Sequence, residues 1–370
     1  MKFSIARDFL LKPLTLVAGA IERRQTLPIL SNVLMEIKDN ELILTGTDLE
    51  VELKGHASCE SIESGGAITV PARKLLDICR ALPEETLMEF SHDQQRLSLK
   101  CGRARFNIAT LPAEDFPNID ESVAQIEFSM SARDLSRLLN QVHFSMALQD
   151  VRYFLNGVLL ELNGQGMRVV ATDGHRLAIS QTIMLETALQ SSNFIIPRKG
   201  VQEIMRLFPS DLEETLAISF SSHFLSIKSE HYSLISKLID GRYPNYDKVI
   251  PKQNNSYLLV SKDNLLQALN CAAIFTNDKY KGVKIQVRPQ LIQVLTKSPE
   301  HEEAADQEIG LIEHQGGELD IVFNVSYLLD ALGAIESENV RFNYSNPEAG
   351  AILENAEDVG ARYIVMPMLL

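Results

Sequence analysis

Cysteine is scarce in this sequence, and its few copies form no recognisable site. The four cysteines, Cys59, Cys79, Cys101 and Cys271, make no C-x-x-C pair, and none lies near a second cysteine or a histidine at metal-ligand spacing. The eight histidines are scattered and form no H-x-x-x-H motif. We therefore expect free thiols in a reducing cytoplasm, and we predict neither a metal site nor a cofactor.

Long apolar runs and an excess of basic charge are also missing. No run approaches the roughly 20 apolar residues of a membrane span, and MKFSIARDFL at the start has neither the apolar core nor the cleavage site of a signal peptide. The 35 basic residues are outnumbered by 49 acidic ones, a net charge of −14. This balance argues against an evenly basic surface coated in nucleic acid. We expect a soluble cytoplasmic protein with no membrane partner.

The sequence does contain a threefold internal repeat. FSIARDFL at 3–10 returns as FSMSARDL at 128–135 and, more weakly, as LVSKDNLL at 259–266, while SNVLMEI at 31–37 returns as NGVLLEL at 156–162. The spacing from copy to copy is about 125 to 131 residues, far longer than the period of a solenoid. With 370 residues and 45% hydrophobic content, we predict three similar tandem domains over residues 1–125, 126–253 and 254–370.

Each domain also repeats within itself. Ala6-Arg7 and the apolar pair that follows return 66 residues later as Ala72-Arg73 and a second apolar pair. The predicted unit is a strand, a helix, and a run of strands joined by short polar turns. We expect the helices over 6–18, 72–82, 132–142, 198–208, 262–273 and 325–335, with Pro13 kinking or shortening the first. Units of this kind predict an α+β fold.

Charge is segregated within this pattern. The six helix ranges hold 11 basic and 6 acidic residues, a net of +5, so the rest of the chain carries −19. For any single helix an ordinary solvated face is an equally good account. Repeated across an array, the pattern indicates a surface that meets phosphates beside an acidic exterior. The last range has no basic residue, so this surface is incomplete in the third domain.

Seven short motifs follow in order along the chain: TLPIL at 26–30, TGTDLE at 45–50, VPARK at 70–74, QDVRY at 149–153, ATDGHRL at 171–177, IPRKG at 196–200 and VMPM at 365–368. Through them the sequence resembles, from Met1 to Leu370, the beta subunit of bacterial DNA polymerase III, the replicative sliding clamp. The resemblance implies a DNA-clamp fold, in which three topologically similar domains per subunit close head to tail with a second subunit into a ring. Such a homodimer would encircle double-stranded and primed DNA without reading its sequence. It would tether the polymerase III catalytic subunit, the clamp loader, other polymerases and repair proteins through short linear peptides.

The resemblance also implies which residues meet DNA. These are Arg24, Arg73, Gln149, Tyr153 and Phe154. Arginines suit phosphates, and an aromatic ring can lie against unpaired bases. The family often has Tyr at position 154, and Phe keeps the ring but loses the hydroxyl. Taken alone, each residue fits an ordinary surface role at least as well.

A hydrophobic pocket for partner peptides is implied by positions that combine apolar walls with a few polar anchors. These are Leu155, Thr172, Gly174, His175, Arg176, Leu177, Pro244, Val249, Asn324, Tyr327, Ile364, Met366, Pro367 and Met368. Methionine suits varied partners, although Met366 and Met368 also fit a plain C-terminal core strand. Leu369 replaces a frequent basic residue, and Glu348 and Gly350 stand where small or apolar residues can line the cleft.

Ring closure implies an interface between the first domain of one subunit and the third domain of the other. Its apolar contacts would join Phe106 and Ile108 to Ile274 and Phe275, and its ion pairs would join Lys74 and Arg103 to Glu300 and Asp306. The charges agree in sign, because 299–308 is acidic and 100–105 is basic. Rim ion pairs contribute only about 0–1 kcal/mol each, so the apolar contacts should dominate.

Two other classes of function fit parts of the sequence. Asp173, two residues before His175, suggests catalysis, but no nucleophile-elbow serine, second carboxylate cluster or Gly-rich phosphate loop accompanies it. Thr172-Asp173 has a repeat partner in Thr47-Asp48, which no histidine follows, so a strand-end turn is the simpler interpretation. We predict no enzyme and no catalytic residue. A purely structural scaffold of tandem repeats also fits the residues.

Overall fold

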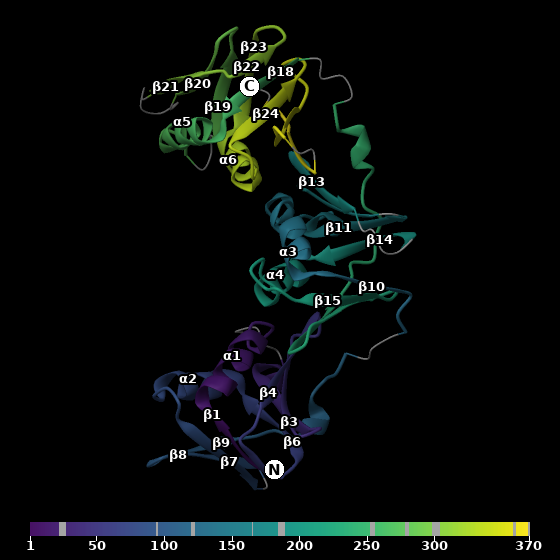
Figure 1. The fold of residues 1–370 in the computed structure, drawn as a ribbon, viewed down its shortest axis with the longest axis vertical. Coiled ribbons are helices and arrows are strands. Elements are labelled where there is room, and N and C mark those ends of the chain that lie inside the picture. Colours follow the sequence, from purple (N-terminus) through teal and green to yellow (C-terminus); the bar gives the residue numbers. More distant parts are fainter. Residues whose placement is uncertain are drawn as a thin grey trace. The chain divides into compact units, whose positions relative to one another are not determined.

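The computed structural model describes residues 1–21, 27–93, 95–119, 123–164, 166–183, 189–251, 256–277, 281–297, 304–357 and 360–368 (Figure 1). Of the predicted site residues, Arg24 and Glu300 lie outside these ranges, as does Leu369 at the predicted cleft edge. Within these ranges, the structure contains no helix with the length and apolar character of a membrane span.

Each of the six predicted units is present as a strand, a helix and a three-stranded meander (Figure 1). Units one and two are β1 (Lys2–Ala6), α1 (Arg7–Val17), β2 (Asn32–Lys38), β3 (Glu41–Thr47) and β4 (Val51–Ser58), then β6 (Gly66–Pro71), α2 (Ala72–Ala81), β7 (Leu87–Asp93), β8 (Arg96–Cys101) and β9 (Ala104–Ala109). Units three and four are β10 (Ile126–Ser131), α3 (Ala132–Asn140), β11 (Gly157–Gly164), β12 (Gly166–Thr172) and β13 (Arg176–Ile183), then β14 (Leu189–Pro197), α4 (Arg198–Leu207), β15 (Thr215–Phe220), β16 (Phe224–Lys228) and β17 (Tyr232–Lys237). Units five and six are β18 (Ser256–Ser261), α5 (Lys262–Ile274), β19 (Gly282–Val287), β20 (Leu291–Lys297) and β21 (Ala304–Gly310), then β23 (Leu319–Asn324), α6 (Val325–Ala334), β24 (Asn339–Tyr344), β25 (Ala351–Asn355) and β26 (Ala361–Val365). Short strands β5 (Ser61–Ser64) and β22 (Glu313–Gln315) are additions to this plan, and the predicted helix positions are confirmed.

The helices form where apolar residues recur every three or four positions. In α2, Leu75, Leu76 and Cys79 are buried, while Arg73 and Lys74 are exposed on the other side. Burial of each leucine side chain contributes about 1.5–3 kcal/mol, so packing of this stripe fixes which side faces outward.

Proline does not end the first helix, so the predicted shortening is wrong, while a kink at Pro13 stays a prediction. Pro13 lies inside α1, which continues to Val17. A Cβ on Gly55 would lie 3.1 Å from the Cβ of Pro13, and one on Gly46 would lie 2.8 Å from the carbonyl oxygen of Val17. The glycines of β3 and β4 therefore let α1 approach the sheet closely, and this contact holds the proline-containing helix in place.

The two units of each pair exchange their first strands. The strand that precedes each helix pairs with the meander of the neighbouring unit: β1 with β7, β6 with β2, β10 with β15, β14 with β11, β18 with β24 and β23 with β19. In the described chain, each first strand therefore lies in a sheet with the meander of the neighbouring unit. This exchange explains why the weak internal repeat produces structural pairs instead of six separate modules.

Two larger sheets form where the last strands of two meanders pair antiparallel. β4 pairs with β17, with Leu53 opposite Leu234, and β13 pairs with β26, with Ala178 opposite Tyr363. The results are an eight-stranded sheet, β10-β15-β16-β17-β4-β3-β2-β6, and a nine-stranded sheet, β14-β11-β12-β13-β26-β25-β24-β18-β22. The remaining sheets are β5-β1-β7-β8-β9 and β21-β20-β19-β23, in which β9 and β21 are edge strands.

The chain forms two compact units that follow the shared sheets. One comprises Met1–Ser136 and Lys199–Leu238 and contains the eight-stranded sheet, and the other comprises Arg137–Arg198 and Ile239–Leu370 and contains the nine-stranded sheet. The chain passes between these units at three points, after Ser136, Arg198 and Leu238, and all three lie within the predicted second domain. Domain limits at 125 and 253 therefore stay a prediction.

Candidate functional site

The Thr-Asp motif forms the same turn twice. After β12, the Thr172 hydroxyl donates to the carbonyl oxygen of Arg176 at 2.5 Å, and the Asp173 carboxylate accepts the backbone N–H groups of His175 at 2.9 Å and Arg176 at 3.1 Å. After β3, the Thr47 hydroxyl donates to the carbonyl oxygen of Val51 at 2.9 Å, and the Asp48 carboxylate accepts the backbone N–H groups of Glu50 at 2.9 Å and Val51 at 2.8 Å. The interpretation of this motif as a strand-end turn is confirmed.

This turn leaves no catalytic pair at Asp173 and His175. The second carboxylate oxygen of Asp173 accepts from Nε of Arg176 at 3.0 Å, so the carboxylate bonds the backbone of His175 and not its ring. The imidazole stacks on Tyr327, with ring centroids 6.4 Å apart. Among the described residues, no group of three or more His, Cys, Asp or Glu side chains could hold a metal ion. The geometry supports a binding surface.

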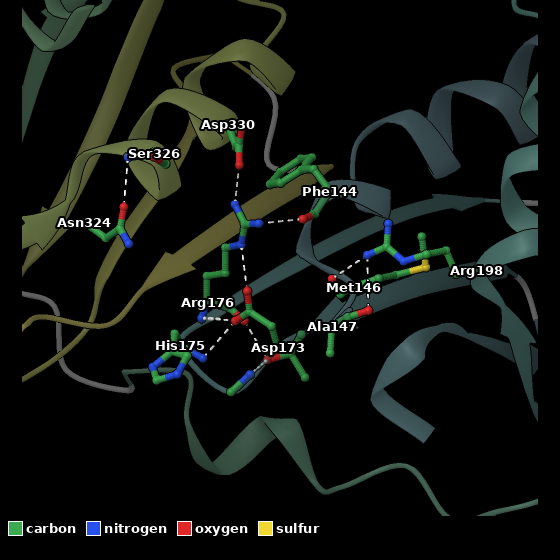
Figure 2. Close-up of polar contacts among 12 residues, drawn as sticks. Phe144, Met146, Ala147, Asp173, His175, Arg176, Arg198, Asn324, Ser326 and Asp330 are labelled. Carbon is green, nitrogen blue, oxygen red and sulfur yellow. Dashed lines mark hydrogen bonds and ion pairs between the residues drawn. The ribbon is translucent and has the colours of Figure 1, made fainter. Parts of the chain in front are cut away.

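Arg176 is the centre of a polar network (Figure 2). Besides Asp173, its guanidinium donates to Asp330 of α6 at 2.5 Å and to the carbonyl oxygen of Phe144 at 2.6 Å, and it lies 4.5 Å from the ring centroid of Tyr327. The side chain is only 13% exposed. Buried bonds with a charged donor are strong and directional. Arg176 therefore fixes the turn against both α6 and the segment that precedes β11.

An apolar cluster lies beneath the predicted peptide site. Leu155, Leu177 and Ile364 pack into one buried cluster with Tyr243 and Tyr246. The N–H of Thr172 donates to the Tyr243 hydroxyl at 3.0 Å, and the Tyr246 hydroxyl bonds Glu161 and accepts from Arg168 at 3.3 Å. Burial, helped by the bond to Glu161, raises the pKa of Tyr246 to about 12. Burial also raises the pKa of Tyr243, so both hydroxyls stay protonated at neutral pH and anchor the segment that carries Pro244 and Val249.

The remaining predicted pocket residues border this cluster on the surface. Val249 is 48% exposed and Met366 is 36% exposed. The N–H of Met366 bonds the carbonyl oxygen of His175 at 3.0 Å, and the N–H of Met368, beside Pro367, bonds that of Val322 at 2.8 Å. Asn324 caps α6 by accepting from the N–H of Ser326 at 3.0 Å (Figure 2). The structure thus brings together the turn 172–176, the C-terminal strand and the start of α6.

The glycine at position 350 has a visible structural reason. A Cβ on Gly350 would lie 3.0 Å from Sδ of Met366 and 3.1 Å from Cγ2 of Ile364. Glycine at this buried position therefore leaves room for those two pocket side chains. Glu348 is exposed beside it, where its N–H bonds the side chain of Asn346 at 3.0 Å.

Three predicted DNA-contact residues belong to one loop. Gln149 and Tyr153 are exposed and Phe154 is half-buried, with the rings of Tyr153 and Phe154 5.7 Å apart in an edge-on arrangement. Gln149 has a φ of 54°, and the side chain of Asn156 bonds both the N–H and the carbonyl oxygen of Asp150 at 2.9 Å. These contacts present the loop as an ordered structure. Arg73 is exposed on α2 in the other compact unit.

The described residues of the predicted interface lie on α2, at edge strands β9 and β21, and at the end of α5. Ile274 is 76% exposed, Phe275 and Phe106 are partly exposed, and Arg103 and Asp306 are exposed, as is Lys74 on α2. Ile108 is 5% exposed and packs within its own sheet. Most of the set is therefore available for contact with another chain.

Several residues that build this site are not identified by the sequence alone. Asp330 and Phe144 bond Arg176, and Tyr243 bonds Thr172. Tyr246 packs in the cluster with Leu155, and Arg198 bonds the carbonyl oxygens of Met146 and Ala147. Their partners are distant in the sequence, and the motif IPRKG was the one signal that pointed near Arg198. A separate open hollow of about 820 Å³, lined by Met167, Arg168, Gln181 and others, includes none of the predicted site residues.

Known proteins of one family match the chain along its whole length. Models of the DNA polymerase III beta subunit match residues 1–120 as its N-terminal domain, 122–245 as its central domain and 247–369 as its C-terminal domain. The chain is 44% identical to the beta sliding clamp of Pseudomonas aeruginosa and 42% identical to that of Escherichia coli K12, in each case over 370 residues that span both proteins completely.

Solved structures agree with the sequence relatives. The crystal structure of the Pseudomonas aeruginosa sliding clamp bound to griselimycin has a TM-score of 0.95 at 44% identity and covers 100% of both chains. The beta sliding clamp of C. crescentus has a TM-score of 0.94 at 34% identity, covering 100% of this chain and 99% of that one. The chain therefore belongs to the DNA polymerase III beta subunit family, the beta sliding clamps, which are processivity factors and not enzymes.

Proposed function

We propose that two copies of this chain close head to tail into a ring around duplex DNA, through pairing of β9 of one copy with β21 of the other. The observation that carries this proposal is the order of the strands. In the described chain, the last strand of unit one (β4) pairs with that of unit four (β17), and unit three (β13) pairs with unit six (β26). The last strands of units two and five, β9 and β21, are left at sheet edges.

The same rule predicts how these two edges are used. Each joint links an odd-numbered unit to the unit three places further along. For unit five that partner is unit two of the next copy, so the joint is heterologous, and such joints form a closed ring when the rotation closes. Pairing would also satisfy backbone N–H and C=O groups that an edge strand leaves open.

Side chains on the two edges support this pairing. Arg103 and Arg105 are exposed at β9, whereas Asp306 and Glu308 are exposed on β21. Opposite charges across an antiparallel pair contribute roughly 0.2–1 kcal/mol each. Ile274 at the end of α5 adds an apolar side chain that is 76% exposed.

We further propose that the chain has three domains, 1–125, 126–253 and 254–370, and acts in the cytoplasm. The three consecutive family-model matches support the domain limits. DNA would be met by Arg24, Arg73, Gln149, Tyr153 and Phe154. Contacts to the phosphate backbone hold the duplex without reading its bases, as sliding requires.

The peptide site is proposed over the apolar cluster beneath Leu155, Leu177 and Ile364. Its occupants would be short peptides of the polymerase III catalytic subunit, the clamp loader, other polymerases and repair proteins. An apolar surface with exposed Val249 and Met366 beside polar groups of the turn 172–176 suits a peptide with leucine or phenylalanine ends. The griselimycin-bound structure of the Pseudomonas aeruginosa clamp supports the presence of a ligand site in this family.

A loading assay tests the ring directly. The purified protein is placed on nicked circular DNA by a clamp loader, and half of the sample is linearised with a restriction enzyme. We expect the protein to stay on circular DNA and to run off linear DNA within minutes. Equal retention on both would contradict encirclement and would favour binding to the DNA surface or a scaffold role.

A further inference from the structure

Two arginines hold residues 144–147, which lead into the loop 148–154 that carries the proposed DNA contacts (Figure 2). We call residues 148–154 the DNA-contact loop. Arg176 donates from Nη2 to the carbonyl oxygen of Phe144 at 2.6 Å. Arg198, the first residue of α4, donates from its own Nη2 to the carbonyl oxygens of Met146 at 2.8 Å and Ala147 at 3.1 Å. Since the donors are charged, these bonds are stronger than neutral ones. The backbone of 144–147 is therefore fixed by side chains from outside its own element.

Arg198 is an unusual residue in this part of the chain. Among the described residues it pairs with no carboxylate, and its Nε is buried without a hydrogen-bond partner. Burial and the nearby charge of Arg176 both lower the pKa of its guanidinium. A part-buried cation without an acidic partner costs stability. Its position is explained by the two carbonyl oxygens that it holds.

The carbonyl groups of Met146 and Ala147 lie at the base of the DNA-contact loop. The N–H of Ala147 bonds the carbonyl oxygen of Leu155 at 2.9 Å, which closes the loop. Ala147 and Leu155 also belong to the apolar cluster under the peptide site, together with Leu177. Arg198 therefore bonds Ala147, which ends the segment 144–147, precedes the loop and belongs to the apolar cluster.

We propose that Arg198 and Arg176 together position the DNA-contact loop, and that Arg176 alone also joins the loop to the peptide site through hydrogen bonds. Both are positioning residues, because neither has to touch DNA. The proposal rests on the proposed role of Gln149, Tyr153 and Phe154 in DNA contact. It also predicts a division of effects: Arg198 serves the loop alone, whereas Arg176 serves both the loop and the peptide site.

The test uses Arg198→Lys in the full-length protein, because lysine keeps the charge but its side chain is one atom shorter and does not place a donor where Nη2 bonds both carbonyl oxygens. Hydrogen exchange of the amides of 145–155 measures how often the base of the loop opens. Fluorescence anisotropy with a short primer–template DNA measures DNA affinity. Binding of a synthetic peptide with leucine and phenylalanine ends measures the affinity of the peptide site. Arg168→Lys is the matched control, since Arg168 bonds the side chains of Gln181 and Tyr246 in the same compact unit.

For Arg198→Lys we expect faster exchange at the amide of Ala147 and a loss of DNA affinity of about three- to tenfold, the range of one modest hydrogen bond. Peptide affinity should stay within about twofold, and Arg168→Lys should leave exchange and DNA affinity unchanged. Arg176→Lys should weaken both DNA and peptide binding.

Unchanged exchange in Arg198→Lys would overturn the positioning role. Faster exchange with unchanged DNA affinity would overturn it as well, provided that Gln149→Ala weakens DNA binding. If Gln149→Ala also leaves DNA affinity unchanged, the proposed DNA contact of the loop fails, and the inference fails with it.

Discussion

A single backbone N–H on β9 should decide whether the ring closes. The N–H of Thr110 donates to the carbonyl oxygen of Gln95 at 3.1 Å, so 110 and 95 form a hydrogen-bonded pair. Bonded and non-bonded pairs alternate along an antiparallel ladder. The N–H of Asn107 therefore points away from β8, toward the free edge. Asn107→Pro removes this donor without breaking a bond inside the chain.

The cost should appear only in the dimer. Proline on an edge strand is tolerated where its missing N–H would face solvent, so the monomer should fold. In the dimer, the partner's carbonyl oxygen on β21 would be buried without a donor, and the ring of proline would push the strands apart. An unsatisfied buried group costs about 1–3 kcal/mol. We therefore expect the dimer Kd to rise by roughly 5- to 150-fold, at 1.4 kcal/mol per tenfold.

Sedimentation velocity over a dilution series measures this Kd, and circular dichroism checks the fold. Ser129→Pro is the control. By the same alternation from Ala132 and Glu214, which bond at 2.9 Å, Ser129 has an outward N–H on edge strand β10. An unchanged Kd in Asn107→Pro, or equal weakening in both variants, would refute the pairing of β9 with β21.

Three further predictions concern the interface, the turn and acid stability. Replacing Ile274 and Phe275 together by Ala should yield monomers in light scattering, because the exposed apolar contact is lost, and an unchanged dimer would contradict this interface. Asp173→Ala should lower the free energy of unfolding in urea by about 2–3 kcal/mol, because two backbone N–H groups and Arg176 lose their acceptor. His175→Ala should change that free energy by less than about 0.5 kcal/mol. Equal losses in the two variants would show that the imidazole has a role beyond the turn. A bond from Lys284 lowers the pKa of Asp320 from 3.8 to about 2, so its contribution is full above about pH 4 and lost as pH falls toward 2. The difference in urea midpoint between the native protein and Asp320→Asn should therefore vanish on acidification from pH 5 to 2, and a difference that persists at pH 2 would exclude this assignment.

Local patterns in the sequence predict the strand–helix–meander units but not which strands of different units pair. Apolar spacing placed α2 and the other helices to within a few residues, because a helix with a buried stripe is specified by its own residues. The exchange of β1 and β6 between neighbouring units could not be derived in this way. Strand partners are chosen by contacts between distant segments, and those contacts leave no period in the sequence.

Pro13 is a second case in which contacts between distant segments decide the structure. Its local effect is to weaken a helix, and the sequence alone therefore predicted a kink or an early end. Gly46 and Gly55 lie more than 30 residues away and allow α1 to rest closely on β3 and β4. Tertiary packing outweighs the missing hydrogen bond, so the helix continues to Val17.

The two Thr-Asp turns show how repeated local structure acquires different uses. Their internal hydrogen bonds match, and both have a residue of positive φ after the Asp, Leu49 at 78° and Gly174 at 91°. The difference lies in the partners of the carboxylates. Asp48 pairs with Lys199 of α4, whereas Asp173 pairs with Arg176, which itself reaches Asp330 of α6.

Each turn therefore forms an ion pair with a helix about 150 residues further along the chain. The signs of the two partners are reversed between the copies. In the first turn the helix supplies the cation, and the acidic side chain of the turn is only 5% exposed. In the second, the turn supplies the cation, and Arg176 is left with a guanidinium that can also hold Phe144 and support His175 beside Tyr327. The three residues that follow Thr-Asp differ between the copies, Leu49-Glu50-Val51 in the first and Gly174-His175-Arg176 in the second. The first copy pairs its Asp with a helix lysine, whereas the second presents an exposed histidine beside an arginine that bonds another helix. The sequence shows this difference, but its meaning depends on Asp330 and Lys199, which only the fold brings to the turns.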